Sequence, residues 1–241
     1  MRYLDSTLLT PEENLACDEA LLTMCEEGLD DEVLRFWEPK QHFVVLGYSG
    51  KVKEEVHERA CTAKGIPILR RFSGGGTVLQ GPGCLNYSVT LRIDNGGPLS
   101  TITGTNSFVM QRHRDVVQAM LKDQVLIQGH TDLALGGMKF SGNAQRRMGR
   151  CLLFHGTFLL HFDISLTQKV LTIPSRQPAY RNNRSHQQFM TNLNIEADRM
   201  KNALRMAWRA DQLLQEKRVP FDRVNDLVQT RYSRKEWNHR L

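Results

Sequence analysis

The sequence predicts an α+β fold in which a mixed, largely antiparallel β-sheet is flanked by helices. Apolar residues recur with a helical period in some segments and with a strand period in others, without internal repeats. The stretch 125–162 is strand-like and contains Gly136-Gly137, which is typical of a hairpin turn. No linker rich in Gly, Ser or Pro divides the 241 residues, so we expect a single domain over residues 1–241.

The first predicted element is a helix that begins at Thr10 and Pro11. Thr10 can cap the helix, Pro11 suits the first helical position, and Glu13 can complete a capping box. Apolar residues at helical spacing then place Cys17 and Cys25 on the buried face. A glycine at position 28 is the expected stop.

The remaining elements alternate between strands and helices. Short β-branched or aromatic runs predict strands at 33–37, 43–46, 66–70, 86–93 and within 125–162. Apolar faces at helical spacing predict helices at 51–64, 109–121, 196–217 and 221–232, with a further helix start after position 164. A glycine-rich segment at 72–83 and a polar segment at 174–188 are expected to be loops.

Composition and charge describe an ordinary globular chain. Of its residues, 40% are hydrophobic and 24% are charged, so it can bury a core without disulfides or a structural metal. The 32 Lys and Arg residues exceed the 26 Asp and Glu residues, but the excess is spread along the chain. Because no basic stripe is interleaved with aromatic residues, we expect no nucleic-acid partner.

Cysteine usage and apolar segments indicate the compartment. Five cysteines without a CxxC pair support neither a zinc ribbon nor a redox motif, and their odd number suggests a reducing compartment. The N-terminus lacks the apolar core of a signal peptide, and no apolar run approaches the ~20 residues that span a bilayer. We therefore expect a cytoplasmic protein with no membrane partner.

A glycine-rich segment, residues 70–78, follows directly from a predicted strand. Its three consecutive glycines at 74–76 lack Cβ atoms, so the backbone can approach a ligand and its N–H groups can surround an anion. Arg70 and Arg71 add guanidinium groups suited to a carboxylate or phosphate. The segment is neither a P-loop nor a dinucleotide fingerprint. A glycine-rich bend with surface arginines is the alternative interpretation.

A lysine on a predicted strand is the main candidate for catalysis. Strand alternation places Lys139 and Ser141 on one face, opposite Met138 and Phe140, which we expect in the core. The Lys139 ammonium could then neutralise a carboxylate or phosphate oxygen as charge moves during a reaction. A solvent-exposed strand lysine is the alternative.

A histidine in a later apolar strand is a weaker candidate. His155, beside Gly156, could line a pocket or could be a buried structural histidine. Neither a Ser-His-Asp arrangement nor an HExxH spacing accompanies it.

Several short motifs, in this order along the chain, resemble those of the lipoate–protein ligase A family, part of the biotin/lipoate A/B protein ligase superfamily. They lie at residues 70–78, 86–88, 132–133, 139–145 and 155–157, with further likeness at 174–176 and 180–185. The resemblance extends from about residue 10 to residue 193. It implies the sheet-and-helix catalytic domain shared by biotin ligases and class II aminoacyl-tRNA synthetases.

The resemblance implies a two-step reaction. Lipoate and ATP would form lipoyl-AMP and pyrophosphate, usually with Mg²⁺. The ε-amine of a lysine on a small acceptor (lipoyl) domain would then attack the mixed anhydride, giving an amide and AMP. The net charge of +6 would suit an acidic acceptor domain.

The resemblance also implies a role for each matching residue. Lys139 would contact the carboxylate and the α-phosphate as an electrostatic stabiliser, and Asp132 would lie near Mg²⁺ or the amine. The loop beside the lipoyl carbonyl and the adenylate would consist of Arg71, Ser73, Gly74, Gly75, Gly76 and Thr77. The other residues expected to bind substrate or adenylate are Asn86, Ser141, Gly142, Asn143, Ala144, Gly156, Thr157 and, in the lipoyl tunnel, His155. Phe72 and Val78 would supply apolar lining.

Two departures from the family pattern bear on the activity. The family often has Asn-Gln after the glycine at position 47, where this chain has Tyr48-Ser49-Gly50. Two-domain ligases carry a C-terminal accessory domain, for which little sequence remains after Tyr232. We therefore expect a monomer that is a single-domain ligase, a catalytic subunit needing a separate accessory subunit, or an acyltransferase.

The main alternative is an octanoyl or lipoyl transferase, which carries the acyl group on a cysteine thioester. In transferases of this kind the cysteine precedes the lysine, in the stretch that corresponds to residues 128–135, and no cysteine occurs there. Cys151 falls in an apolar strand, and Cys84 is the one other cysteine expected near the site. The ligase is therefore the favoured prediction. A non-catalytic binding module would not require Lys139 or the glycines at 74–76.

Overall fold

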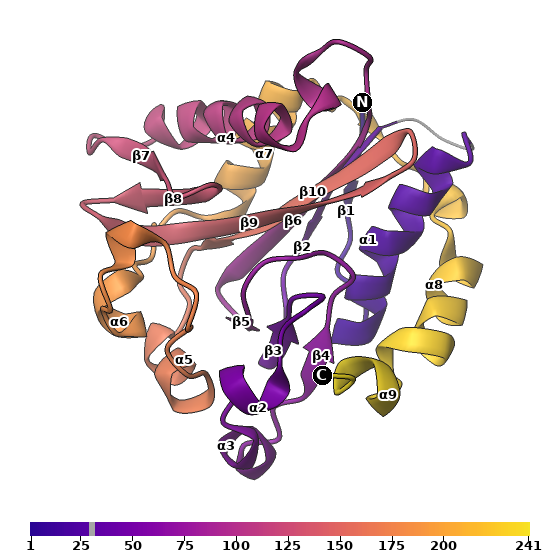
Figure 1. Ribbon diagram of the computed structural model, residues 1–241. Helices are drawn as coiled ribbons and strands as arrows, with labels where there is room; N and C mark the ends of the chain where they lie inside the picture. Colours follow the sequence, from indigo (N-terminus) through magenta and orange to yellow (C-terminus); the bar gives the residue numbers. More distant parts are fainter. Residues whose placement is uncertain (29–31) are drawn as a thin grey trace.

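The computed structural model describes residues 1–28 and 32–241, and within them eight strands form one large sheet (Figure 1). The strand order is β11-β1-β2-β6-β10-β9-β8-β7. Strand β1 pairs in parallel with β2 and β11, and the other neighbours are antiparallel. The strands are β1 (Arg2–Asp5), β2 (Val33–Trp37), β6 (Cys84–Arg92), β7 (Val125–Gln128), β8 (Asp132–Leu135), β9 (Met138–Met148), β10 (Cys151–Leu159) and β11 (Gln212–Leu213). The predicted mixed, largely antiparallel sheet is confirmed.

A smaller sheet and several helices complete the described part of the chain. The smaller sheet has the order β4-β3-β5, with β3 parallel to β4 and antiparallel to β5. Its strands are β3 (Phe43–Leu46), β4 (Ile68–Arg70) and β5 (Val78–Gln80). The α-helices are α1 (Pro11–Glu26), α2 (Val52–Glu55), α3 (Glu58–Ala63), α4 (Ile102–Gln118), α5 (Ile164–Val170), α6 (His186–Phe189), α7 (Ala197–Trp208), α8 (Phe221–Leu227) and α9 (Lys235–Asn238).

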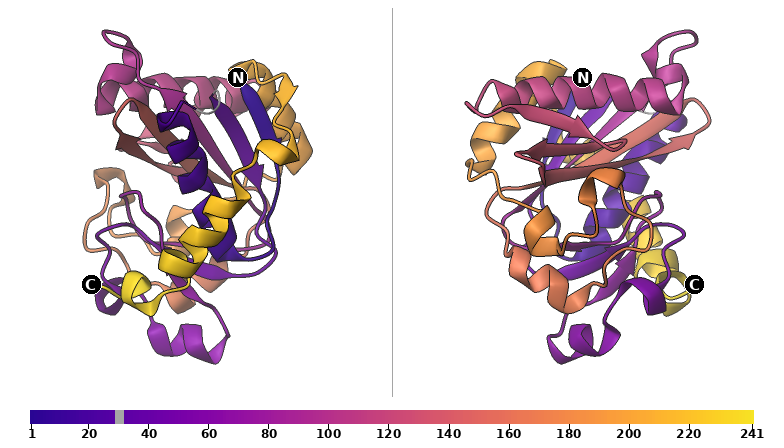
Figure 2. Two further views of the ribbon diagram at one scale, coloured as in Figure 1. Left: turned by 90° about the vertical axis from the view of Figure 1, so that its right-hand side faces the viewer. Right: turned by 60° about the vertical axis from the view of Figure 1, so that its left-hand side comes forward.

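Helices cover both faces of the large sheet (Figures 1 and 2). Helices α4 and α7 pack on one face, where Leu34 and Phe36 of β2 join a buried apolar cluster with residues of both helices. Helix α1, backed by α8, covers the other face, where Val33 and Trp37 of the same strand are buried. Alternate side chains of β2 enter different cores, so apolar residues lie on both faces of this strand, with the buried Arg35 between Val33 and Trp37.

Helix α1 has the predicted start. The Glu13 N–H donates to Thr10 Oγ1 at 3.2 Å, and Glu13 Oε2 accepts from the Thr10 N–H at 2.9 Å, which completes the capping box. The helix ends at Glu26, and Gly28 has a φ of +73°, as the predicted glycine stop requires. The predicted burial of Cys17 and Cys25 is confirmed.

Two predicted helices are wrong in their extent. The segment 51–64 forms α2 and α3 instead of one helix, because Val56 adopts an extended conformation and bridges to Leu171. The segment 196–217 is helical only as far as Trp208, because Arg209 has a φ of +49° and the chain then enters β11. In both cases, backbone pairing with a segment distant in sequence replaces the local helical hydrogen bonds.

The predicted burial of Met138 is also wrong. Phe140 is fully buried as expected, but Met138 is 36% exposed. The pairing between β8 and β9 shifts between Leu133 and Ala134, so that one extra residue of β9 interrupts the strict alternation. None of the helices formed within residues 1–28 and 32–241 combines the length and apolarity that crossing a bilayer requires.

Candidate functional site

A cavity of about 600 Å³ lies between the large and small sheets. Its wall includes residues of β2, β6, β9 and β10 on one side, residues of β3 and β5 on the other, and Leu15 of α1. Lys139 and the glycines Gly75 and Gly76 all line this cavity. The fold therefore brings together the lysine and the glycine-rich segment that the sequence singled out separately.

Most of the predicted site residues line the same cavity. They are Arg71, Gly75, Gly76, Thr77, Asn86, Asp132, Lys139, Gly142, Asn143, Ala144, His155, Gly156 and Thr157, together with the apolar candidates Phe72 and Val78. Four predicted residues do not line it, namely Arg70, Ser73, Gly74 and Ser141. Ser73 is hydrogen-bonded to His155, Gly74 accepts hydrogen bonds from Arg71, and Ser141 lines a smaller adjoining cavity.

Arg71 holds the glycine-rich loop in shape. Its guanidinium is largely buried and donates to the main-chain oxygens of Gly74 and Gly76 at 2.6 and 2.9 Å. Burial lowers the pKa of Arg71 to about 10, with Glu55 opposing the shift, so the group remains a cation at neutral pH. Gly75 has a φ of +92°, a conformation that favours glycine.

A neighbouring loop presses directly on this glycine-rich loop. A Cβ atom at Gly47 would lie 1.9 Å from the Gly75 carbonyl oxygen, so only glycine fits at position 47. The Tyr48 N–H donates to the Ser73 carbonyl oxygen at 2.8 Å. Tyr48, where the family pattern often has a polar Asn, thus contributes its backbone to the support of the site, and its ring is partly exposed.

The predicted role of Arg70 as a ligand-binding group is wrong, and so is the alternative of a surface arginine. Its side chain is fully buried, and its guanidinium donates to main-chain oxygens, including those of Gly50 at 2.6 Å and Trp237 at 3.0 Å. Arg70 lines neither the 600 Å³ cavity nor the smaller cavity beside it. Consecutive arginines on a strand end point in opposite directions, so Arg71 reaches the site and Arg70 does not.

Ser73, which lies behind the cavity wall, is hydrogen-bonded to His155, which lines the cavity. Ser73 Oγ lies 2.6 Å from His155 Nε2. Burial, reinforced by the Arg71 charge, lowers the pKa of His155 to about 3, so the imidazole is neutral at physiological pH. Next to His155, a Cβ atom at Gly156 would lie 1.7 Å from Asn143 Oδ1. The absence of a side chain at Gly156 of β10 therefore leaves room for the Asn143 side chain of the neighbouring strand β9.

Lys139 is paired with Asp132 at the junction of strands β8 and β9. Lys139 Nζ lies 2.7 Å from Asp132 Oδ1, and the Tyr180 hydroxyl donates to Asp132 Oδ2 at 2.8 Å. A Cβ atom at Gly142 would lie 2.5 Å from Lys139 Nζ, so the missing side chain leaves room for the ammonium. The lysine side chain keeps 26% of its surface exposed, so it remains accessible from the cavity.

A row of polar side chains crosses the site from β5 to β6. Gln80 Nε2 donates to Thr157 Oγ1 at 2.7 Å, and the Thr157 hydroxyl donates to Asn86 Oδ1 at 2.5 Å. Asn86 Nδ2 and Gln80 Oε1 are buried and lack a hydrogen-bond partner within residues 1–28 and 32–241. One buried donor and one buried acceptor are therefore available to a bound molecule.

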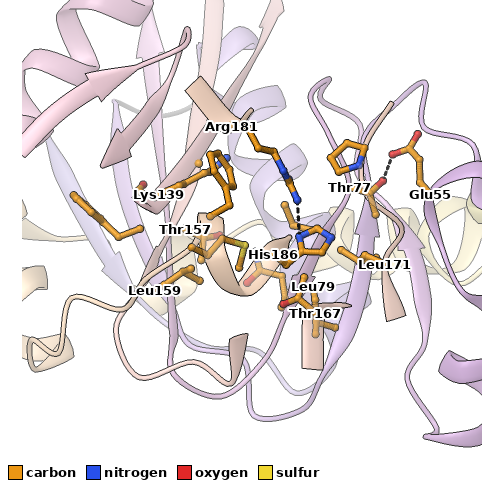
Figure 3. A pocket seen from close by; sticks show the side chains of 18 of the residues that line it. Glu55, Thr77, Leu79, Lys139, Thr157, Leu159, Thr167, Leu171, Arg181 and His186 are labelled. Carbon is orange, nitrogen blue, oxygen red and sulfur yellow. Dashed lines mark hydrogen bonds between the residues drawn. The ribbon is translucent and has the colours of Figure 1, made fainter. Parts of the chain in front are cut away.

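A second, smaller cavity of about 120 Å³ adjoins the first (Figure 3). The two cavities share Thr77, Lys139 and Thr157 in their walls, and the small one continues past Leu79 and Leu159. Figure 3 shows two hydrogen bonds among its lining residues, from Thr77 to Glu55 and between Arg181 and His186. The site therefore has a large and a small branch, and Lys139 is among the residues that line both.

Sequence reasoning missed several lining residues. Arg181 lines both branches and stacks over Phe189, with 4.7 Å between its Cζ and the ring centroid. The likeness at 180–185 pointed to this segment but assigned no role within it. Asp18 of α1 lines the large branch and is paired with the buried Arg35 at 2.7 Å, which helical spacing alone does not reveal.

The cysteines and the carboxylates limit the chemistry of the site. All five cysteines are buried, and none lines either branch. Burial raises the pKa of Cys84 to about 12, and burial with the contact to Cys25 raises that of Cys151 to about 12. Cys84 is buried in the apolar cluster that contains Leu79, Leu159 and Leu171, which line the small branch, so it lies behind the wall of the site and its thiol does not face the cavity. Within the described ranges, no group of three or more His, Cys, Asp or Glu residues could hold a metal ion.

Comparison with known proteins identifies the chain as an enzyme of a family whose curated members are named lipoate-protein ligases or octanoyltransferases. Residues 10–216 match the profile of the lipoyl protein ligase A/B catalytic domain, and the chain belongs to this family.

Relatives with different activities span most of the chain. It is 27% identical to lipoate-protein ligase A subunit 1 of Thermoplasma acidophilum, over 93% of this chain and 90% of the relative. It is 25% identical to the octanoyltransferase LipM of Brevibacillus brevis, over 99% of this chain and 98% of the relative. Because one relative is named as a ligase subunit and the other as an octanoyltransferase, the sequence comparison does not distinguish ligation from acyl transfer.

Solved structures share the fold at 24% identity. A Thermoplasma acidophilum protein with bound lipoic acid superposes with a TM-score of 0.81 over 100% of both chains. A bipartite lipoate protein ligase, studied with its E2 lipoyl domain from the same organism, has a TM-score of 0.80 over 99% of this chain and 96% of its own. A lipoate-protein ligase A bound with ATP also has a TM-score of 0.80, over 99% of both chains.

Proposed function

We propose that this protein is an ATP-dependent lipoate–protein ligase. It would activate lipoate to lipoyl-AMP and transfer the lipoyl group to a lysine of an acceptor domain. The observation that carries this proposal is the lining of both cavity branches by Lys139, with no cysteine in the wall of either branch. Such a site can hold an acyl group and a nucleotide end to end, but it offers no thiol to carry an acyl group.

The large branch suits the lipoyl chain. Its wall includes the apolar side chains of Leu15, Trp37, Val45 and Phe72. Burying an alkyl chain against such a surface contributes about 0.8 kcal/mol per CH₂ group. In this proposal the carboxylate of lipoate points out of the branch toward Lys139.

The small branch suits the nucleotide base, with the glycine-rich loop beside the phosphate. Leu79, Phe140 and Leu159 line it, and Ser141 adds a polar edge. The close contacts of Gly75 with Arg71 and with Gly47 fix the backbone of the loop, which lines the large branch together with Lys139. The α-phosphate would then lie between the loop and the Lys139 ammonium.

Lys139 would act in both steps as a cation. In the first step, a carboxylate oxygen of lipoate attacks the α-phosphorus of ATP, and pyrophosphate leaves with the electron pair of the broken P–O bond. In the second step, the acceptor lysine amine attacks the acyl carbonyl, AMP leaves and the amine loses a proton. Negative charge builds on oxygen near Lys139 in both steps, and a positioned ammonium lowers the barrier most where that charge develops. Asp132 would orient the ammonium.

The site fits Mg²⁺ only together with the phosphates of ATP. Mg²⁺ is usually held by one or two carboxylates plus substrate phosphates, and Asp132 is the carboxylate nearest to Lys139 in the cavity wall. Asp132 would therefore be its protein ligand, and the ion would offset phosphate charge when bound.

The second candidate is an octanoyl or lipoyl transferase, because the Brevibacillus brevis relative is named an octanoyltransferase. That reaction requires a thiolate within reach of the acyl group. Cys151 Sγ lies 2.8 Å from Cys25 Sγ in a buried cluster, and Cys84 is buried behind the apolar residues that line the small branch, so neither thiol faces the cavity. Because burial keeps these thiols protonated, we favour the ligase.

The proposal extends to partners. A lipoyl domain as acceptor, and a separate accessory subunit, are supported by the relative named as subunit 1 and by the bipartite ligase studied with its E2 lipoyl domain. We further propose that residues 1–241 act as one catalytic domain, as a monomer, in the cytoplasm. The continuity of the large sheet from β1 near the N-terminus to β11 supports the single domain.

Mass spectrometry of a lipoyl domain incubated with the purified protein tests the function. With lipoate, we expect the lipoyl domain to gain the mass of one lipoyl group only when ATP is present. The reaction is run both with and without a candidate accessory subunit. A parallel reaction supplies an octanoylated carrier protein without ATP. Modification in that reaction, together with none from lipoate and ATP, would reject the ligase in favour of the transferase.

A further inference from the structure

Residues 217–241 lie beyond the part of the chain that matches the family profile. They nevertheless form hydrogen bonds with Arg70, the last residue before the glycine-rich loop begins at Arg71. Helix α9 packs beside β4, which leads into the glycine-rich loop (Figures 1 and 2). We propose that Arg70, Trp237 and Asn238 are positioning residues that hold the glycine-rich loop in its ligand-binding shape. This inference deepens the proposed ligase function and rests on it for the identity of the ligand.

The first link runs from the C-terminal segment to Arg70. The Trp237 indole N–H donates to the Arg70 carbonyl oxygen at 2.8 Å, and Asn238 Oδ1 accepts from the Arg70 N–H at 2.9 Å. The Arg70 guanidinium returns hydrogen bonds to the Trp237 and Asn238 carbonyl oxygens at 3.0 and 3.1 Å. Four hydrogen bonds thus join two segments separated by about 167 positions in sequence.

The second link runs from Arg70 to the loop that presses on the glycines. Arg70 Nη1 donates to the main-chain oxygens of Gly47, Tyr48 and Gly50, at 3.0, 3.1 and 2.6 Å. That loop, residues 47–50, meets the glycine-rich loop at the Gly47 and Gly75 contact and at the hydrogen bond from the Tyr48 N–H to the Ser73 carbonyl. The Arg70 guanidinium is fully buried, and its hydrogen bonds all go to backbone oxygens. Because these charge-assisted bonds fix the orientation of the guanidinium, Arg70 determines the position of residues 47–50.

A third contact connects the same segment to the apolar wall. The Trp237 ring packs with Phe72, Leu22 and Cys151 in one cluster, and Phe72 lines the large branch of the cavity. Upstream, Tyr232 is fully buried and its hydroxyl donates to Glu19 Oε2 of α1 at 2.7 Å, which anchors the segment. Glu19 follows Asp18, which lines the cavity. The C-terminal segment therefore contacts three elements next to the cavity: Arg70, the apolar cluster that contains Phe72, and Glu19 of α1.

Two variants and one matched control separate positioning from general stability. Asn238→Ala removes the acceptor for the Arg70 N–H, and Trp237→Phe removes the indole donor but keeps an aromatic ring in the cluster. Arg223→Ala is the control, because it breaks the exposed ion pair of α8 with Glu27, at 2.8 Å, away from the cavity.

Hydrogen–deuterium exchange of the protein without substrates is the first readout. We expect faster exchange in residues 47–50 and 73–77 of N238A and W237F than in the wild type, and no change in R223A. For ligation, the KM for lipoate should rise about tenfold with kcat changed much less, since losing a buried hydrogen bond corresponds to that factor.

The outcomes distinguish this inference from the proposed function. Unchanged exchange at 47–50 and 73–77 in both variants would overturn the inference, whatever the ligation assay shows. Unfolding of both variants would also overturn it, because the segment would then serve overall stability. If the wild type does not ligate lipoate while the exchange result holds, the proposed substrate is wrong and the positioning role stands.

Discussion

Lys139 Nζ and Asp132 Oδ1 lie 2.7 Å apart in the wall of the large branch of the cavity, and Lys139 also lines the small branch. The second oxygen of Asp132 accepts a hydrogen bond from Tyr180, so the carboxylate is held from both sides and the lysine is oriented by it. An ammonium oriented before substrate arrives needs little reorganisation when negative charge develops nearby. This relationship underlies the catalytic part of the proposed function.

The variant Lys139→Ala should therefore lower lipoate-dependent ATP–pyrophosphate exchange by about 100-fold or more, the size of effect seen when an electrostatic stabiliser is removed. Far-UV circular dichroism should stay unchanged, because the side chain faces the cavity. Lys51→Ala, which removes an exposed lysine paired with Glu54 on α2, is the control and should retain exchange. Exchange retained in K139A would remove the proposed role of this residue.

The variant Gly75→Val should eliminate binding of lipoate and of the adenylate. The residue has a φ of +92°, and a Cβ atom would lie 2.8 Å from Arg71 Nη2. A β-branched residue at positive φ is strained by ~1–2 kcal/mol or more, and it would also displace Arg71. Isothermal titration calorimetry measures the affinity. Gly65→Val introduces the same strain at a φ of +61° in open space and should lower only the melting temperature.

The stability of the protein should depend on His155 below pH 6.5. Burial and Arg71 depress the pKa of this histidine from 6.5 to about 3 in the folded state. Between these values the unfolded chain binds a proton that the folded chain does not, so the free energy of unfolding falls as the pH falls. One such group contributes a slope of up to about 1.4 kcal/mol per pH unit.

Urea unfolding at several pH values between 7 and 4 tests this dependence with two variants. His155→Gln should lose that part of the slope, whereas Ser73→Ala removes the hydrogen bond but keeps the buried imidazole and should keep the slope. An unchanged slope in H155Q would show that the imidazole is not held neutral by its surroundings.

Single replacements of Cys84 and Cys151 by serine should preserve ATP-dependent ligation. Both thiols are buried with pKa values raised to about 12, and neither lines the cavity. A buried hydroxyl should lower the melting temperature, so activity is to be compared at a temperature where each variant is folded. Loss of activity, with loss of a thioester adduct in the intact mass, would move the assignment to the transferase.

Much of the fold follows from local patterns, and so do most of the cavity residues. The capping box at Thr10, the strands that became β2, β3, β6 and β10, and the Gly136-Gly137 turn depend on neighbours within a few positions. The motifs around Lys139 and the glycines at 74–76 could be recognised because each is short and contiguous. Their convergence on one cavity was implied only by family resemblance, since strand order is not encoded in any one segment.

Local patterns in the sequence specify most of the segments that become helices, strands and glycine-rich loops, because those choices depend on hydrogen bonds and steric contacts between near neighbours. The tertiary structure was needed to show that Arg71 supports the ligand loop, through oxygens three and five positions away, while Arg70 is buried against Trp237. It was also needed to show that the helix expected at 51–64 breaks where Val56 meets Leu171. The partners of Arg70 and Val56 lie more than 100 positions away. Partners that are so distant in sequence meet only when the sheets and helices pack together, and the local spacing of residues does not specify that packing.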